Sequence, residues 1–309
     1  MPAKVKLGLG LGPWPFGPAD PERFLDYIDR AEGLGIDSVW VSERLVGGSV
    51  LEPVAALAVA AGRTRRLKLG TSVLIPALRQ PVFLAKELAT LDFLSRGRLL
   101  LTVGLGADDP AEFAAVGVPR SERAGRTEEA VVLLRRLWAE DQVTFSGRYY
   151  RVQGVEIWPK PFRPGGPPIW VGGRSEAALD RAARLGDGWL ASSITPEEFA
   201  AGRRRIEALL CRYGRTIEPD HYGIYLPFFV AATRSRAWEL AGPYLLRRRT
   251  DVDPAAYSAI GSLADCRAAI DRYLAAGAVK FVLRPVGPPE ALAEQLDILA
   301  EALCPAYEG

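Results

Sequence analysis

The chain has 309 residues, of which 49% are apolar and 25% are charged, with 31 glycines and 24 prolines. This composition excludes a disordered chain, a collagen-like fibre and a small scaffold held by disulfides. The formal charge of +2, from 39 basic and 37 acidic residues, argues against a general electrostatic nucleic-acid binder.

Cysteine and histidine usage points to a reducing compartment and away from metals. The three cysteines, Cys211, Cys266 and Cys304, form no C-x-x-C pair, so we expect a cytoplasmic protein without a disulfide framework or zinc site. The single histidine, His221, argues against a multi-histidine metal centre, and we expect no metal. No apolar run reaches about 18 residues, so we expect no membrane span and no signal peptide.

The chain contains no asparagine and one methionine. A thermophile that avoids thermolabile residues would show this usage. A GC-rich genome would produce the same bias, and the sequence does not separate the two explanations.

Along the chain, short runs typical of strands alternate with amphipathic runs typical of helices. We expect strands at 5–11, 37–43, 67–75, 97–106, 167–173, 187–193, 222–232 and 278–285. The expected helices are 22–35, 51–64, 81–95, 121–141, 175–186, 196–214, 262–277 and 289–303. Residues 107–120 form a connecting excursion, 143–159 alternate like a β-hairpin, and 234–260 are irregular and helical.

Eight strand–helix units in about 300 residues are the signature of a single (β/α)8 barrel. We therefore expect one domain over residues 1–309, with an insertion around 107–160. The alternative is a doubly wound open sheet, which the count of eight and the lack of a G-x-G-x-x-G turn after the first strand disfavour.

The ends of the expected strands hold few acids and bases, and no serine–histidine–aspartate set can be assembled. This scarcity suggests that a bound cofactor supplies the chemistry. The Gly172-Gly173-Arg174-Ser175 turn would suit a phosphate, because glycines let the backbone approach an anion at a helix start. Ser192 and Ser193 could donate to the same phosphate. The alternative is a tight turn in which Ser175 only caps the helix.

Five segments, in order, resemble the bacterial luciferase-like monooxygenase family, including its branch that uses the deazaflavin coenzyme F-420. They are SVWVSER, the long run from Leu67 to Gly106, RVQGVEIWPKP, PPIWVGGRSEAALDRAARLGDGW and AVKFVLRP. The resemblance implies an oxidoreductase that acts on a small organic substrate with reduced FMN or the deazaflavin, by hydride transfer or monooxygenation.

The resemblance also implies site residues. Glu43 and Arg44 would take part in catalysis, with Glu43 at the polar edge of the ring. The cofactor would be bound by Thr71, Ser72, Val73, Gly104, Gly106, Gly172, Gly173, Arg174, Ser192 and Ser193. In this family the ring rests on a bulge with a cis peptide that does not involve proline, and the matching bond here is Ser72–Val73.

Two positions depart from the family pattern. Arg44 stands where the family often has histidine, and Ala107 stands where the sugar-phosphate dehydrogenase branch has glutamate. Arg44 could bind an anionic substrate or stabilise an oxyanion, or it could pair with Glu43 or another nearby acid. Alcohol oxidation by proton abstraction is disfavoured without these two groups.

Three functional readings stay open. The first is the redox enzyme, with a weak preference for the deazaflavin over FMN because of the Thr71-Ser72-Val73 sequence. The second is a flavin-binding protein without catalysis, and the third is a barrel hydrolase or lyase that takes a phosphorylated ligand.

Family members commonly pair through the helices after strands two and three, so we also expect a homodimer through the alanine-rich run 55–61.

Overall fold

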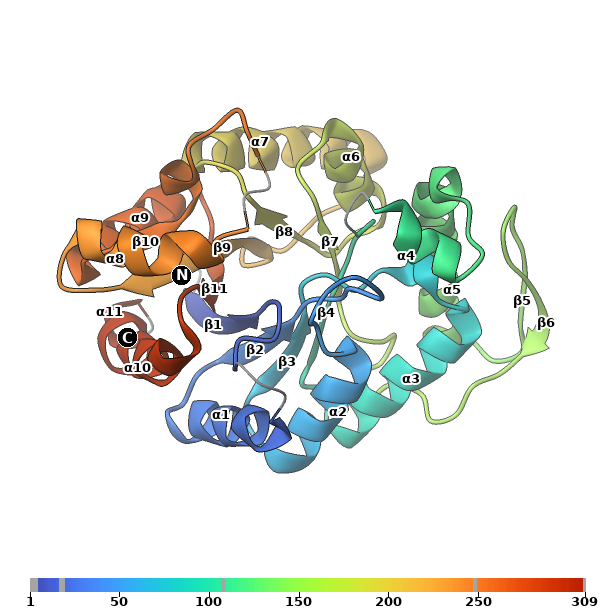
Figure 1. Ribbon diagram of the computed structural model, residues 1–309. Helices are drawn as coiled ribbons and strands as arrows, with labels where there is room; N and C mark the ends of the chain where they lie inside the picture. Colours follow the sequence, from blue (N-terminus) through green and yellow to red (C-terminus); the bar gives the residue numbers. More distant parts are fainter. Residues whose placement is uncertain (1–4, 17–19, 107–108, 247–248, 308–309) are drawn as a thin grey trace.

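The protein is a closed barrel of eight parallel strands surrounded by helices, in a computed structural model that describes residues 5–16, 20–106, 109–246 and 249–307 (Figure 1). The barrel strands are β1 (Lys6–Leu11), β2 (Ser38–Val41), β3 (Lys68–Thr71), β4 (Leu99–Val103), β7 (Ile169–Gly172), β8 (Gly188–Ser192), β9 (Tyr222–Val230) and β11 (Lys280–Pro285). Pairing of β9 with β8 and of β11 with both β9 and β1 closes the ring. The predicted (β/α)8 barrel is confirmed.

Helices connect successive strands on the outside of the barrel. They are α1 (Pro21–Gly33), α2 (Pro53–Arg63), α3 (Pro81–Leu94), α5 (Arg123–Ala139), α6 (Glu176–Leu185), α7 (Pro196–Tyr213), α9 (Leu263–Ala275) and α10 (Leu292–Ile298). After α10 the chain forms a π-helical turn, Leu299–Leu303, and the short helix α11 (Cys304–Tyr307). Among the described residues, no helix is long and apolar enough to cross a bilayer.

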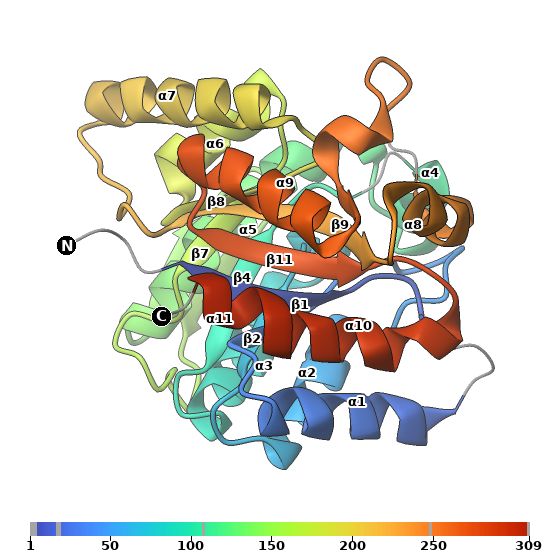
Figure 2. The same cartoon turned by 90° about the vertical axis from the view of Figure 1, so that its left-hand side faces the viewer.

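Two excursions interrupt the strand–helix repeat. Between β4 and β7 lie α4 (Pro110–Ala115), the 3-10 turn η2 (Arg120–Glu122) and the predicted hairpin, β5 (Val143–Ser146) and β6 (Arg151–Val155). Between β9 and α9 lie α8 (Arg234–Ala241), the 3-10 turns η3 (Gly242–Tyr244) and η4 (Pro254–Tyr257), and β10 (Ala259–Gly261). Figure 2 shows α4 and α8 at the end of the barrel where the strands finish, which we call the C-terminal mouth.

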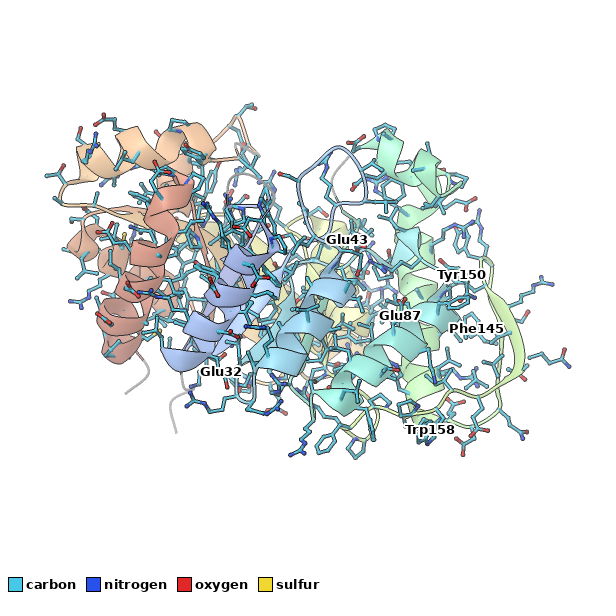
Figure 3. All side chains as sticks on the ribbon, turned by 60° about the horizontal axis from the view of Figure 1, so that its bottom comes forward. Glu32, Glu43, Glu87, Phe145, Tyr150 and Trp158 are labelled. Carbon is cyan, nitrogen blue, oxygen red and sulfur yellow. The ribbon has the colours of Figure 1, made fainter. Side chains whose placement is uncertain are left out.

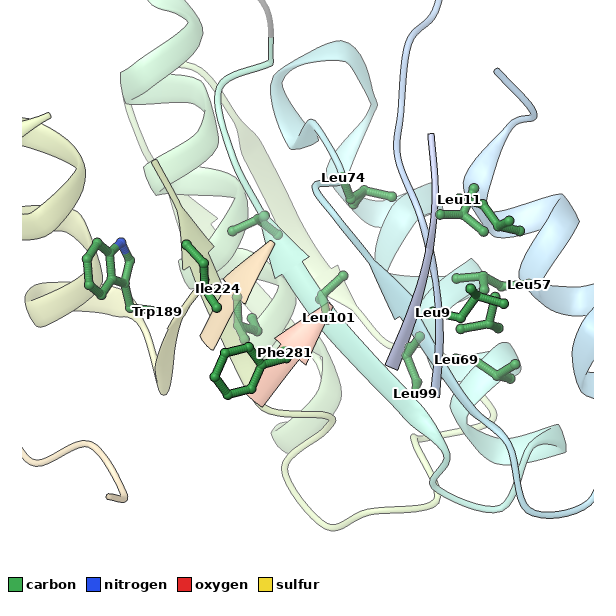
Figure 4. Packing of buried hydrophobic residues seen from close by; sticks show 14 of the residues in the cluster. Leu9, Leu11, Leu57, Leu69, Leu74, Leu99, Leu101, Trp189, Ile224 and Phe281 are labelled. Carbon is green, nitrogen blue, oxygen red and sulfur yellow. The ribbon is translucent and has the colours of Figure 1, made fainter. Parts of the chain in front are cut away.

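Alternation along the strands divides the core into two parts. In β1, the odd-numbered Leu7, Leu9 and Leu11 are buried in the large cluster between strands and helices. Figure 4 shows members of this cluster, among them Leu9, Leu69 and Leu57 of α2. The even-numbered positions of β1 point into the barrel, because side chains on a strand alternate between its two faces; in β9 the odd-numbered positions, such as Tyr225, do so.

Two tryptophans fill the inside of the barrel. Trp40 of β2 and Trp170 of β7 form a separate buried cluster with residues from β4, β8, β9 and β11. The neighbouring strands β3 and β8 provide glycines: a Cβ on Gly70 would lie 2.2 Å from Trp40 Cδ2, and one on Gly188 would lie 2.6 Å from Trp170 Cδ2. Each indole therefore fits only because the neighbouring strand carries no side chain at that height.

An ion cluster closes the opposite end of the barrel. The carboxylate of Asp37, whose side chain is 6% exposed, accepts a hydrogen bond from Lys280 and one of 2.9 Å from Lys68. The Lys280 ammonium also lies 5.8 Å from the centre of the Trp40 ring. Burial alone would raise the pKa of Asp37, but the two ammonium groups outweigh it and hold the pKa well below its usual range.

Replacement of Asp37 tests this cluster. We expect Asp37→Asn to lower the free energy of unfolding by about 3 kcal/mol at neutral pH, because the variant removes the carboxylate that pairs with the buried Lys280 ammonium. Urea unfolding measures the loss. The exposed pair of Asp29 with Arg63 is the matched control, and Asp29→Asn should cost less than about 1 kcal/mol.

The same variant carries a pH signature. A carboxylate with a depressed folded pKa stabilises fully above its unfolded pKa of about 4 and progressively less as the pH falls toward the folded value. The difference in stability between wild type and Asp37→Asn should therefore shrink from neutral pH to about pH 3. A difference that stays constant with pH would contradict the depressed pKa.

Candidate active site

Small residues line the C-terminal mouth, directly above the tryptophan layer. At the C-terminal end of six barrel strands, the inward position holds glycine or serine. These positions are Gly12, Ser42, Ser72, Gly104, Gly172 and Ser192. The mouth therefore opens onto a floor of indole rings and walls with little side-chain bulk. Among the described residues, no cluster of histidine, cysteine and acidic side chains could hold a metal ion.

The chain leaves regular strand geometry directly after β3. The Ser72–Val73 peptide is cis, as the family resemblance predicts, and the expected strand 67–75 ends at Thr71. The amide of Leu74 then donates to Thr102 O at 2.8 Å, and Gly104 N donates to Leu74 O at 2.9 Å. The segment thus forms a bulge that remains bonded to β4.

Val73 of this bulge occupies the space of two missing side chains. A Cβ on Gly104 would lie 2.7 Å from Val73 Cγ2, and a Cβ on Gly172 would lie 2.5 Å from Val73 Cγ1. Gly106 plays a similar part for Ile75, whose Cδ1 would lie 2.6 Å from an added Cβ. These glycines of β4 and β7 therefore make room for the bulge, and a role in cofactor binding stays a prediction.

Glu43 clamps the bulge from the side of β2. Its amide donates to Val73 O at 3.3 Å, and its carboxylate accepts hydrogen bonds from Ile75 N and from Arg79. The side chain is only 4% exposed. Burial raises the pKa of Glu43, while the Arg79 guanidinium acts in the opposite direction. Figure 3 shows Glu43 near one end of α2, with Glu32 near the other end.

Neighbouring residues complete the clamp. Ser42 Oγ donates to Ser72 O at 3.0 Å. The buried Thr71 hydroxyl donates to Thr102 O at 2.8 Å and accepts from Thr102 N at 2.9 Å, so it supports the bulge from behind. Arg79, which the sequence did not mark, comes from the end of the turn η1 (Pro76–Leu78) and also pairs with Glu52 at 2.6 Å.

Arg44 takes the ion-pair alternative, with an acid other than Glu43. Its Nη2 lies 2.5 Å from the Asp109 carboxylate, and its Nε donates to Val46 O at 3.1 Å. Glu112 of α4 accepts a hydrogen bond of 2.8 Å from Leu45 N. The loop after β2 is therefore tied to the excursion after β4. Ala107, whose identity argued against alcohol oxidation, lies outside the described residues.

The expected phosphate-binding residues come together at the ends of β7 and β8. Ser175 caps α6 by accepting from Ala178 N at 3.3 Å, and Gly173 has φ +116°, which favours glycine. Arg174 Nη1 donates to Ser193 O at 3.0 Å.

A second guanidinium reaches the same carbonyl. Arg249 Nη1 lies 3.3 Å from Ser193 O and 2.6 Å from the Glu198 carboxylate. A helix N-terminus, two glycines and the Arg174 guanidinium therefore meet at one corner of the mouth, beside Arg249, whose charge is paired with Glu198 and Asp251. This combination attracts a phosphate or another anion.

Comparison with known proteins identifies the family. A profile of the luciferase-like monooxygenases matches residues 2–304. The chain belongs to the luciferase-like monooxygenase family. A monooxygenase of this fold, RslO1 from Streptomyces bottropensis, superimposes with a TM-score of 0.84 over 98% of this chain and 100% of that one, at 28% identity.

The names of curated relatives of this luciferase-like chain mention F420 or a pterin substrate. An F420-dependent glucose-6-phosphate dehydrogenase from Kineococcus radiotolerans is 37% identical over 61% of this chain and 57% of that protein. A 5,10-methylenetetrahydromethanopterin reductase from Archaeoglobus fulgidus is 29% identical over 68% of this chain and 61% of that protein. The match thus spans about three fifths of the relatives' length.

A double-mutant cycle tests the contact between Val73 and the glycine wall. We expect Gly172→Ala to lower stability by about 1–3 kcal/mol, because its methyl group overlaps Val73. In the Val73→Ala background the same change should cost much less, and urea unfolding of the four proteins gives the coupling energy. Gly62→Ala is the control, since nothing lies within 4 Å of a Cβ there. Additive effects of Gly172→Ala and Val73→Ala would disprove the contact.

Proposed function

We propose that the protein is an oxidoreductase that uses the deazaflavin coenzyme F420 to reduce or oxidise a small organic substrate. The observation that carries the proposal is the pairing, at one mouth, of the Val73 bulge with the anion-attracting corner at the ends of β7 and β8. A planar ring joined to a phosphate needs these two features side by side. The named relatives of the family support the same choice.

The described residues fit such a cofactor. Val73 and the walls around Gly104 and Gly172 offer a flat surface without side chains in the way. Free amide groups at the start of α6, with Ser192, suit the phosphate. The acidic tail of the deazaflavin would meet Arg174 and Arg249. When bound, the deazaflavin supplies hydride transfer, which the side chains of the mouth do not provide.

A second candidate is an FMN-dependent monooxygenase. The observation that favours it is the likeness over the whole chain to the Streptomyces bottropensis monooxygenase. FMN carries the same kind of phosphate but lacks the acidic tail. The two candidates therefore differ in whether the cofactor has an acidic tail that can contact the basic residues of this corner.

Titration with both cofactors separates the candidates. We expect F420 to bind more tightly than FMN, and Arg174→Ala to weaken F420 binding by about tenfold and FMN binding by less, because one charge-assisted hydrogen bond is worth about 1.5 kcal/mol. Fluorescence titration of the purified protein measures both affinities. Arg66→Ala, a change at a guanidinium near the far end of the barrel, is the control.

The outcomes of this titration decide between the readings. Tighter binding of FMN, with oxygen consumption, would favour the monooxygenase. Binding of F420 without turnover of any substrate would favour a binding protein without catalysis. Binding of neither cofactor would overturn the proposal and leave the hydrolase or lyase reading.

The departures at Arg44 and Ala107 give a substrate prediction. We expect no appreciable oxidation of glucose 6-phosphate with F420, because Arg44 is engaged with Asp109 and cannot act as a general base. Absorbance of F420 during incubation with the sugar phosphate measures this. Robust turnover would show that the missing histidine and glutamate do not define the reaction.

An exposed apolar face supports the expected homodimer. Phe83 and Leu94 of α3 are 73% and 70% exposed, and Val59 of α2 is 48% exposed. In the alanine-rich run 55–61, Ala55 and Ala58 are exposed with Val59, whereas the other alanines are buried against the barrel. The face available for pairing is therefore formed by α2 and α3 together, which pack against each other.

Charge placed on this face should break the dimer. We expect Phe83→Asp with Leu94→Asp to convert a wild-type dimer into a folded monomer, because a buried, unpaired carboxylate opposes association. Light scattering coupled to gel filtration measures the mass. Ala208→Asp, at an exposed site on α7 across the barrel, is the control (Figure 1). A wild-type monomer at micromolar concentration would refute the homodimer.

A further inference from the structure

Glycines occupy the inner face of β1 from its middle to the C-terminal mouth. The run K-L-G-L-G-L-G alternates outward leucines with the inward positions Gly8, Gly10 and Gly12. A Cβ on Gly10 would lie 3.0 Å from Tyr225 Cε2 and 3.1 Å from Val282 Cγ1. The space in front of β1 is therefore taken by side chains from other strands, among them Tyr225 of β9.

Tyr225 reaches this space from beyond β11, which lies between β9 and β1 in the sheet. It pairs in register with Ser192 of β8 and with Val282 of β11, so it stands at the height of a mouth residue. Cε2 is bonded to the ring carbon that carries the hydroxyl. The polar end of Tyr225 therefore lies beside Gly10, on the side of β9 that faces away from the phosphate corner.

The Tyr225 hydroxyl is accessible to solvent. The side chain is partly exposed, and none of the described residues forms a hydrogen bond with its hydroxyl. That hydroxyl is not one of the side-chain atoms that are buried without a partner, in contrast to the hydroxyls of Tyr27 and Tyr257. The rings of Trp40 and Trp170 fill the barrel beneath it. Small molecules can therefore reach Tyr225 from the mouth.

A pocket of about 170 Å³ opens in the same part of the mouth, between β1 and β11. Gly10 belongs to its wall, together with several prolines and the side chains of Trp14 and Tyr244. The polar end of Tyr225 lies beside Gly10 and therefore next to this pocket. An apolar cavity of about 150 Å³ in another protein holds benzene, so a single six-membered ring fits here. In a mainly apolar site, one placed hydroxyl fixes the orientation of a ligand.

We propose that Tyr225 selects and orients the substrate by donating a hydrogen bond to a carbonyl oxygen. A phenol hydroxyl can donate to a carbonyl or accept from an alcohol. The carbonyl is favoured because Arg44 is bound to Asp109 and cannot take a proton from an alcohol. That the bound molecule is the redox substrate rests on the proposed function. The binding preference itself does not, because it depends only on the Tyr225 hydroxyl.

Two probes of the same shape test the proposal: cyclohexanone, which carries an oxygen acceptor, and methylenecyclohexane, which carries a methylene group in its place. Calorimetric titration measures both affinities in wild type and in Tyr225→Phe, which removes only the hydroxyl. We expect the ratio of ketone to alkene affinity to fall about fivefold in the variant, the worth of one hydrogen bond between neutral groups. The infrared carbonyl band of the bound ketone should also lie at lower wavenumber in wild type than in Tyr225→Phe.

Tyr222→Phe is the matched control, because Tyr222 lies on the same strand but is buried in the large cluster outside the barrel. It should leave the affinity ratio at the wild-type value. F420 titration of Tyr225→Phe should match wild type, and thermal melting checks that both variants fold.

The outcomes separate this proposal from the proposed function. Loss of F420 binding in all proteins, with the fall of the ketone-to-alkene ratio in Tyr225→Phe retained, would overturn only the proposed function. An unchanged ratio in Tyr225→Phe, an equal fall in Tyr222→Phe, or no ketone binding at millimolar concentration would overturn the assignment of Tyr225.

Discussion

Two indole rings fill the inside of the barrel, and this filling determines which residues can stand at its C-terminal mouth. An eight-stranded barrel has an interior just wide enough to be filled by side chains. Trp40 and Trp170 supply most of that filling, and they require glycine at Gly70 and Gly188 on the neighbouring strands. With the interior filled so low, the next inward position on several strands, such as Ser42 and Gly172, can be small without leaving a void. The open mouth is therefore a consequence of the large residues beneath it.

The bulge after β3 likewise depends on glycines that leave room for a larger side chain. Val73 enters the mouth from the wall, and it does so where Gly104 and Gly172 leave room. Main-chain hydrogen bonds from both neighbouring strands hold the segment, and Glu43 bonds it from behind. The Glu43 carboxylate is buried, and its charge is balanced by the guanidinium of Arg79, to which it is bound. This geometry favours a positioning role for Glu43 over proton transfer.

Strand order, helix order and the barrel were predictable from the sequence, because alternation and helical spacing repeat eight times. The ends of β3 and β4 were not, since the apolar run Val73–Ile75 reads as strand until the bulge is known. Arg79 and Asp109 escaped prediction because ion pairs between loops depend on distances that no local pattern encodes. The ninth strand, β10, was missed because three residues carry too little periodicity.

The mouth has two halves with different chemistry. The half formed by β3, β4, β7 and β8 offers main-chain groups, glycines and guanidinium groups, which suit a large planar ligand with a phosphate. The half formed by β1 and β11 has a pocket with aromatic and proline walls. The carboxylates near the first half, Asp109 and Glu198, are paired with the guanidinium groups of Arg44 and Arg249. Under the proposed function, the half with the glycines and guanidinium groups would hold the cofactor, and the reaction would draw on the cofactor rather than on a side chain of the wall.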